Sequence, residues 1–292
     1  MTVVVGYLAG RVGLSGLHLG VRVARTLKTS LTVVTIVPRP WLTPSRGRVD
    51  AEYEQFADQL AADSAAEAQR QLRKLSDGLE VSYRYRAHRS VSGGLIEIVE
   101  ESDAEILVLG SLPSARRGQV VIGSTADWLL HSSRVPVAIS PRGYRAHAAG
   151  LTQLTCAYAA TPEAVDVVRR CTAVAQRFGV PMRVLTFAVR GKAMYQSGVG
   201  LDAEDSIVEA WASQALAIQD NLKIDGIVAE EVVLQVVTAK SWRQALRATG
   251  WQDGEILALG TSPRGDMRRV FLGSRSAKII RHSPVPVLVL PG

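Results

Sequence analysis

The fold is decided by the stretch Glu105–Pro141, which reads EILVLGSLPSARRGQVVIGSTADWLLHSSRVPVAISP. The stretch Glu255–Pro291 repeats it without a gap, as EILALGTSPRGDMRRVFLGSRSAKIIRHSPVPVLVLP. Each copy opens with a short apolar run typical of a buried strand, passes through a loop to Gly-Ser and a helical pattern, and ends in an apolar strand. The chain is therefore predicted to be a tandem repeat.

The elements outside the two copies follow the same order in each half. We expect strands at 3–7, 31–37, 81–87, 106–109 and 135–139, and again at 154–158, 182–187, 232–237, 256–259 and 285–290. We expect helices at 14–27, 50–77, 95–101, from 124, at 162–178, 203–222, 242–248 and from 274. Alternating strands and helices imply a parallel sheet covered on both faces. The prediction is an α/β protein with two doubly wound five-stranded sheets, in domains 1–143 and 151–292.

Composition narrows the class of protein. The net charge of +7 is spread over both halves in pairs and triplets, so we expect no nucleic-acid partner. The two cysteines form no Cys-x-x-Cys motif and are expected to be buried thiols in a reducing cytoplasm, with no metal site. The first residues have the pattern of a strand and not of a signal peptide, and no apolar run reaches about 18 residues. We expect a cytoplasmic protein without a membrane span.

The loops of the repeated block are the candidate ligand site. In doubly wound sheets, ligands bind beyond the carboxyl ends of the strands. Gly110 and Gly260 end two such strands, and Gly-Ser opens each following helix, where backbone N–H groups attract anions. Ser124 has two interpretations, because it can bind a phosphate or cap its own helix.

The spacing of these loops resembles that of the universal stress protein family. The family's nucleotide loop reads Gly-x-x-Gly, nine residues, then Gly-Ser or Gly-Thr. The copies here read Gly110-Ser111-Leu112-Pro113 and Gly260-Thr261-Ser262-Pro263, each followed by nine residues and Gly-Ser. The Val-Pro-Val of each last strand also resembles the family. The site residues that the resemblance implies are Val37, Gly110, Ser111, Gly123, Ser124, Thr125, Gly260, Thr261, Gly273 and Ser274.

The resemblance implies a tandem universal stress protein with Rossmann-like domains, of the adenine nucleotide alpha hydrolase-like type. Such a protein would act in the stress response by binding ATP or ADP, with Mg²⁺ only alongside the nucleotide, or by binding a protein partner. The halves would pair through their last strands as an intramolecular pseudo-dimer, and a homodimer is a further possibility. Both last strands are apolar enough to need covering.

Two departures weaken the nucleotide site. Pro113 and Pro263 stand where ATP-binding members have the second glycine, and proline has no N–H to donate. Those members also end the first strand in an aspartate, whereas residues 6–10 and 157–161 contain no acid. Each lost hydrogen bond costs about 0.5–3 kcal/mol. A scaffold with empty pockets is therefore an alternative to nucleotide binding.

The first half is expected to keep more of the site, because Thr125 follows its Gly-Ser where Arg275 follows the second one. Arg275 can pair with a phosphate or fill the pocket. Val37 resembles the family's position beside the adenine, although valine is also an ordinary core residue. The loop arginines can screen phosphate charge or simply be exposed; they are Arg116, Arg117, Arg264, Arg268 and Arg269.

The remaining motifs favour packing over catalysis. Gly13, Gly16 and Gly20 recur at helical spacing, which favours close packing of a helix on the sheet over a dinucleotide loop. The chain has no Gly-x-Ser-x-Gly motif and no P-loop, and the acids 97, 100 and 101 are interpreted as a solvated helix face. A slow ATP hydrolase, the third hypothesis, would need Mg²⁺ ligands, and Asp266 is nearly alone in the loops. We therefore predict a binding protein and not an enzyme.

Overall fold

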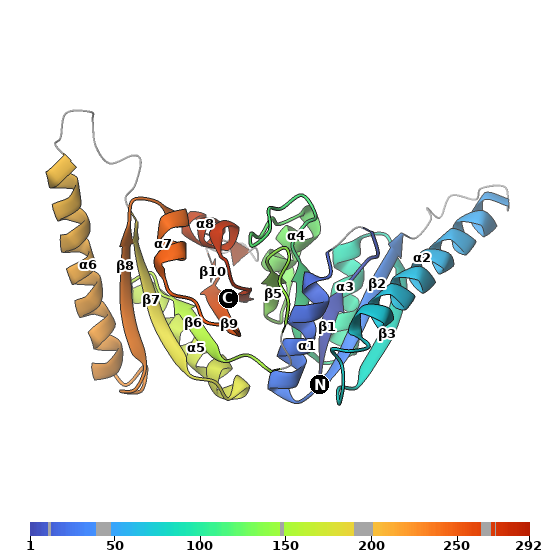
Figure 1. The fold of residues 1–292 in the computed structure, drawn as a ribbon, viewed down its shortest axis with the longest axis horizontal. Coiled ribbons are helices and arrows are strands. Elements are labelled where there is room, and N and C mark those ends of the chain that lie inside the picture. Colours follow the sequence, from blue (N-terminus) through green and yellow to red (C-terminus); the bar gives the residue numbers. More distant parts are fainter. Residues whose placement is uncertain (11–12, 39–47, 147–148, 190–200, 264–269, 272) are drawn as a thin grey trace.

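The computed structural model describes residues 1–10, 13–38, 48–146, 149–189, 201–263, 270–271 and 273–292 (Figure 1). The elements of the first half are β1 (Thr2–Gly6), α1 (Ser15–Leu27), β2 (Ser30–Pro38), α2 (Arg48–Leu72), β3 (Val81–His88), α3 (Val91–Glu101), β4 (Ala104–Gly110), α4 (Ser124–Ser132) and β5 (Val137–Ser140). Those of the second half are β6 (Gln153–Ala157), η1 (Pro162–Ala164), α5 (Val165–Phe178), β7 (Met182–Val189), α6 (Leu201–Ile224), β8 (Val233–Ala239), α7 (Trp242–Ala248), β9 (Glu255–Gly260), β10 (Ser262–Pro263), β11 (Val270–Phe271), α8 (Ser274–His282) and β12 (Val287–Leu290).

The predicted α/β fold is confirmed, and the two five-stranded halves join into one sheet. The strand order is β3-β2-β1-β4-β5-β12-β9-β6-β7-β8. Neighbouring strands within each half are parallel, whereas β5 and β12 pair antiparallel at the centre, with Ile139 opposite Val287. This pairing gives each apolar last strand a hydrogen-bonded neighbour on both sides, so neither is an open edge.

The helices form two layers, one on each face of the sheet. Residues of α1, α2, α5 and α6 pack on one face in a single core cluster that runs through both halves. Residues of α3, α4, α7 and α8 pack on the other face. Figure 1 shows α2 and α6 at the two far ends of the molecule, over the outer strands. In each half the first two helices therefore lie on one face and the last two on the other, because the strand order reverses direction after the third strand and right-handed crossovers then place the helices on the opposite face.

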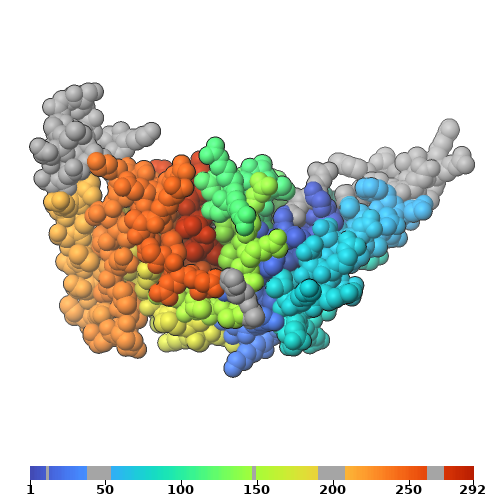
Figure 2. Space-filling model, viewed as in Figure 1, coloured from blue at the N-terminus to red at the C-terminus, as the bar shows by residue number. Residues whose placement is uncertain are grey.

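The halves are packed directly against each other in the space-filling view (Figure 2). Among the described residues, two ion pairs cross the junction besides the strand pairing. Arg22 of α1 holds Asp253 with N–O distances of 3.2 and 2.8 Å, and Arg177 of α5 holds Glu105 with distances of 2.9 and 2.8 Å. Arginine and carboxylate in this two-point geometry fix orientation as well as distance.

Two glycines of α1 are required by the close packing of this helix on the sheet. A Cβ on Gly20 would lie 2.3 Å from a methyl group of Val5, and one on Gly16 would lie 3.0 Å from the backbone nitrogen of Gly110. The packing interpretation is confirmed for these two. It is wrong for Gly13, which has open space around it.

Several local features differ from the sequence prediction, among them the end of α2 at Leu72 instead of 77 and the start of α3 at Val91 instead of 95. Residues Pro162–Ala164 form a short 3-10 turn before α5, so the α-helix begins three residues later than expected. The strand pair β10–β11 was not foreseen. The Val-Pro-Val strands begin only after their prolines because proline has no N–H for the ladder. Among the described residues, no helix is both long and apolar enough to span a membrane.

Candidate functional site

A cavity of about 380 Å³ opens in the second half, at the carboxyl ends of β6, β7 and β9. Parallel strands bring the loops that follow them to one edge of the sheet, which is where doubly wound proteins bind ligands. Its volume falls in the usual range for small-molecule sites. The sequence favoured the first half as the better site, whereas this cavity lies in the second.

One end of the cavity is aromatic. Phe187 near the end of β7, Trp242 at the start of α7 and Trp211 of α6 line it. The rings of Phe187 and Trp242 lie 6.0 Å apart, tilted by 58°. These residues lie outside the repeated block, so the sequence pattern did not predict them. The available signal was that tryptophan follows the helix-capping Ser241, where Val91 follows the capping Ser90 in the first half.

The N-terminus of α8 lines the cavity on the β9 side, with Gly260, Gly273 and Arg275, two strands along the sheet from Phe187 of β7. Gly273 is the N-cap residue and has nothing within 4 Å of the position that a Cβ would take. The first-turn N–H groups of a helix have no intrahelical acceptor, and this end carries partial positive charge. The aromatic end and this cationic end give the cavity the polarity that a ring bearing an anionic group needs.

Two acids and an arginine also line the cavity. Glu163 of η1 and Asp166 of α5 line the cavity together with Arg170. Arg170 pairs with Asp166 at 3.0 Å and also donates to the carbonyl of Pro291. Burial, with smaller contributions from Cys156 and Glu163, raises the pKa of the Tyr158 hydroxyl in the same wall, so it stays protonated at neutral pH.

In the first half, side chains of the corresponding loop lie over the start of its helix. Leu112 lies 3.1 Å from the position of a Cβ on Gly123 and so covers the start of α4. Ser111 is 2% exposed and accepts a hydrogen bond from the Val121 N–H at 2.8 Å. Val37 is fully buried in a small cluster with residues of α2. Val37 thus packs as a core residue, and its place beside an adenine stays a prediction.

The helix starts do not support the capping interpretation of Ser124, and its phosphate interpretation stays a prediction. The N-cap residues of α4 and α8 are Gly123 and Gly273, and neither start has a side-chain cap. Ser124 and Ser274 are exposed first-turn residues, so capping does not explain them. Thr125 is half-buried in the turn after Gly123.

Most of the other predicted loop residues are in contact with neighbouring parts of the chain. Gly110 lies against Gly16 of α1, and Gly260 lies against Val167 of α5. Thr261 is 1% exposed and donates to the carbonyl of Leu290 at 3.1 Å, so its hydroxyl is occupied although it lines the cavity. Arg117 lies over Gly143, and Arg116 is exposed. Arg264, Asp266, Arg268 and Arg269 lie outside the described residues.

No catalytic or metal-binding group emerges in the described part of the chain. No three of its histidine, cysteine, aspartate and glutamate side chains form a group that could hold a metal ion. Cys156 and Cys171 are free and fully buried, as expected. The acids of α3 are paired and not merely solvated, since Arg86 of β3 holds Glu97 at 3.0 Å and Glu101 at 2.6 Å.

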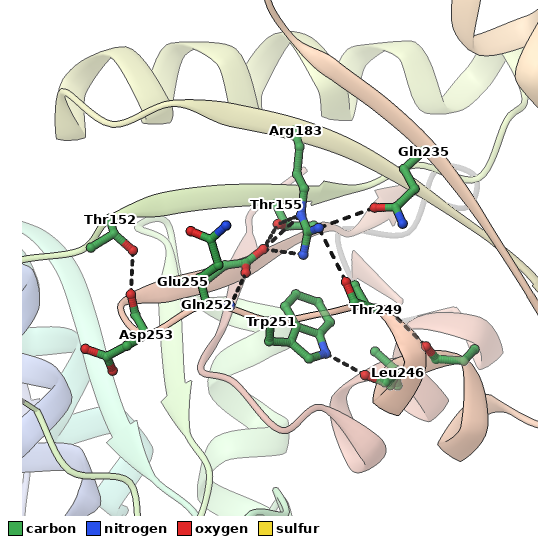
Figure 3. Close-up of polar contacts among 11 residues, drawn as sticks. Thr152, Thr155, Arg183, Gln235, Leu246, Thr249, Trp251, Gln252, Asp253 and Glu255 are labelled. Carbon is green, nitrogen blue, oxygen red and sulfur yellow. Dashed lines mark hydrogen bonds and ion pairs between the residues drawn. The ribbon is translucent and has the colours of Figure 1, made fainter.

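A second polar cluster lies at the amino-terminal ends of β6, β7 and β9, where Arg183 meets Glu255 (Figure 3). The ion pair measures 2.6 Å, and Thr155 and Gln235 add hydrogen bonds to it. The guanidinium also lies 5.3 Å from the ring centre of Trp251. This cluster is internally paired and buried at the far end of the sheet from the cavity, so we assign it to stability and not to binding.

Comparison with known proteins agrees with this architecture. The family model described as the universal stress protein family matches residues 1–141 and again residues 152–291. Proteins named universal stress protein in Mycobacterium tuberculosis and in Mycobacterium bovis are each 68% identical to this chain over 292 residues, which is 100% of either sequence.

Solved structures add likeness of fold. A universal stress protein from Archaeoglobus fulgidus superposes with a TM-score of 0.60 at 14% identity, covering 99% of this chain and 98% of that one. A putative universal stress protein from Pseudomonas aeruginosa gives 0.58 at 12% identity, covering 99% and 92%. With two matches of the family model and relatives at 68% identity along the whole chain, the protein belongs to the universal stress protein family, in its tandem two-domain form.

Proposed function

We propose that this protein binds one adenine nucleotide per chain, ATP or ADP in the first instance, in the cavity of its second half. It acts as a cytoplasmic stress-response factor through that bound state or through a protein partner, and not through turnover. The observation that carries the proposal is the polarity of the cavity, with three aromatic side chains at one end and the uncapped N-terminus of α8 at the other.

The two ends suit the two parts of a nucleotide. A base can stack on Trp242 or Trp211, and stacking of a base on an aromatic side chain is worth about 1–3 kcal/mol. A phosphate can accept from the free N–H groups of α8 and pair with Arg275, which is exposed beside them. Arg275 thereby offsets in part the backbone N–H that Pro263 cannot donate. The first half has Thr125 at the position of Arg275.

One site per chain follows from the difference between the halves. Leu112 covers the start of α4, whereas Ser262 occupies its place in the repeat and the start of α8 is open. The first half supports the second instead, because β5 pairs with β12 and α4 lies against β11 beside the cavity loop. Turnover is disfavoured, since the described residues contain no group of acids that could hold Mg²⁺.

Calorimetric titration of the full chain with ATP, ADP and AMP, with and without Mg²⁺, tests the proposal. We expect binding at one ligand per chain. Trp242→Ala should weaken it by about 1–3 kcal/mol. Val91→Ala, the matched change at the equivalent position of the first half, should leave it unchanged.

Three results would contradict the proposal. Absence of heat at millimolar concentrations of all three nucleotides would leave only the scaffold with empty pockets. A stoichiometry of two would mean that the first half also opens in solution. Release of phosphate at a steady rate, with Mg²⁺ present, would instead support the hydrolase.

A further inference from the structure

The ten-stranded sheet ends in two edge strands, β3 in the first half and β8 in the second. Residues 232–239, which include β8, read VVLQVVTA and contain no charged residue, no proline and no glycine. The side chain of Val233 at the start of this strand is 57% exposed. An apolar edge strand without charges is a ready surface for pairing with a strand of another chain.

The equivalent edge of the first half is protected by cations. Arg84 and Arg86 lie within β3, and acids of α3 hold Arg86 at 3.0 and 2.6 Å. Counted back from the capping serines of α3 and α7, the same positions of β8 hold Gln235 and Val237. Charged residues on an edge strand are a common protection against pairing with other chains. The two edges occupy the same place in the fold, but only β3 has this protection.

The two ends of β8 carry opposite charges. The exposed acids Glu230 and Glu231 precede the strand, and the exposed cations Lys240 and Arg243 follow it. Within the described part of the chain, none of these four side chains takes part in an ion pair. A second copy of β8 that runs antiparallel brings its basic end to the acidic end of the first, whereas a parallel copy would place like charges together. The edge is therefore complementary to itself.

We propose that the chain forms a homodimer in which β8 pairs antiparallel with β8 of a second copy, so that the two sheets continue into one. A twofold axis perpendicular to the sheet makes this contact closed, because each copy uses the same surface. Pairing centred on Gln235 places Glu230 opposite Lys240 of the second copy. It also places Val233 opposite Val237 of the second copy, and apolar pairs of this kind stabilise antiparallel strands.

The helix beside this edge adds exposed apolar surface to it. Helix α6 lies at the far end of the molecule next to β8 (Figure 1), and its Gln219 donates to the Gln235 carbonyl at 3.1 Å. The side chains of Leu216 and Ile224 on α6 are 43% and 79% exposed. The twofold axis brings the two α6 helices to the same face of the joined sheet, next to the paired strands, where burial of exposed apolar side chains stabilises the dimer.

Sedimentation velocity of the full chain, from about 1 to about 100 µM, tests the proposal. We expect the native protein to dimerise reversibly in this range. Val233→Lys, which gives β8 the kind of charge that protects β3, should raise the Kd of the dimer by about tenfold or more. Ser82→Lys, the matched change at the equivalent exposed position of β3, should leave the Kd unchanged.

Exchange of the end charges tests the antiparallel alignment. Glu230→Lys and Lys240→Glu should each raise the Kd by about threefold to tenfold, because like charges then face each other at both ends of the pair. The double variant should restore the native Kd, because opposite charges face each other again. A chain that stays monomeric at about 100 µM would overturn the proposal. A dimer that Ser82→Lys weakens and Val233→Lys does not, or a double variant as weak as the single ones, would also overturn it.

Discussion

The contact between Arg22 and Asp253 is predicted to be unequal in its two members. The side chain of Arg22 is 0% exposed, whereas that of Asp253 is 62% exposed. Arg22 also donates to the Tyr144 hydroxyl at 2.7 Å and to the Ala149 carbonyl at 3.3 Å. Asp253→Ala therefore leaves a buried cation without its carboxylate, whereas Arg22→Met leaves a carboxylate that can turn into water.

The magnitudes follow from this difference in burial. Removing one partner of a buried ion pair costs about 3–5 kcal/mol, and two remaining acceptors place Asp253→Ala at the lower end, about 3 kcal/mol. Arg22→Met keeps the packed stem and loses hydrogen bonds, so we expect about 1–2 kcal/mol. For a chain of this length, each kcal/mol lowers Tm by about 2 °C. The expected decreases are about 6 °C for Asp253→Ala and about 2–4 °C for Arg22→Met.

A double-mutant cycle tests this prediction. It compares the Tm of the native protein, of each single variant and of the double variant. The double variant should be more stable than Asp253→Ala alone, because it no longer contains the unpaired buried cation. Equal loss in the two single variants would refute the reasoning. A double variant less stable than Asp253→Ala would also refute it, since the two halves would then be held by the two residues independently.

Three further predictions concern stability. Gly20→Ala should lower the free energy of unfolding in urea by about 1–3 kcal/mol, because its methyl group would lie 2.3 Å from a valine methyl group of β1. Gly13→Ala adds a methyl group in open space and should lower it by under about 0.5 kcal/mol. Burial, with a smaller contribution from a neighbouring arginine, lowers the pKa of His18 from 6.5 to about 4. The unfolded chain then binds the proton more readily, so the native protein becomes less stable as the pH falls from 6.5 to 4. Over this range its free energy of unfolding should fall by about 3 kcal/mol more than that of His18→Gln. Parallel pH profiles of the two proteins would contradict this. Glu255→Ala should lower the free energy of unfolding in urea by about 3–5 kcal/mol, because it leaves Arg183 unpaired with only 10% of its side chain exposed. A decrease below about 1 kcal/mol would contradict this.

Most of the fold could be predicted from the sequence because its signals are local. The period of apolar residues separates strands from helices, and the gapless repeat assigns the same order to both halves. The misplaced ends have local reasons that pattern alone does not weigh. Pro136 and Pro286 delay the last strands, and Pro162 begins a 3-10 turn ahead of α5. Gly13 shows that a glycine at helical spacing need not be a packing glycine.

The candidate site could be predicted only in part, for a physical reason. Its glycines and helix start lie in the repeated block, but its aromatic end comes from β7, α6 and α7, which meet only in the folded sheet. Whether a loop is open also depends on which side chain folds back over it, and Leu112 and Ser262 occupy equivalent positions in the repeat. The sequence therefore favoured the first half, although the open cavity lies in the second.

The sequence by itself determined the repeat, the alternation of strands and helices and the family, because each of these is written in the order and spacing of residues. Only the tertiary structure decided three other things. It joined the halves through β5 and β12 into one sheet, buried Arg22 against Asp253, and left one loop open beside aromatic residues from distant elements. These depend on contacts between residues far apart in the chain, and such contacts are fixed by packing and not by local pattern.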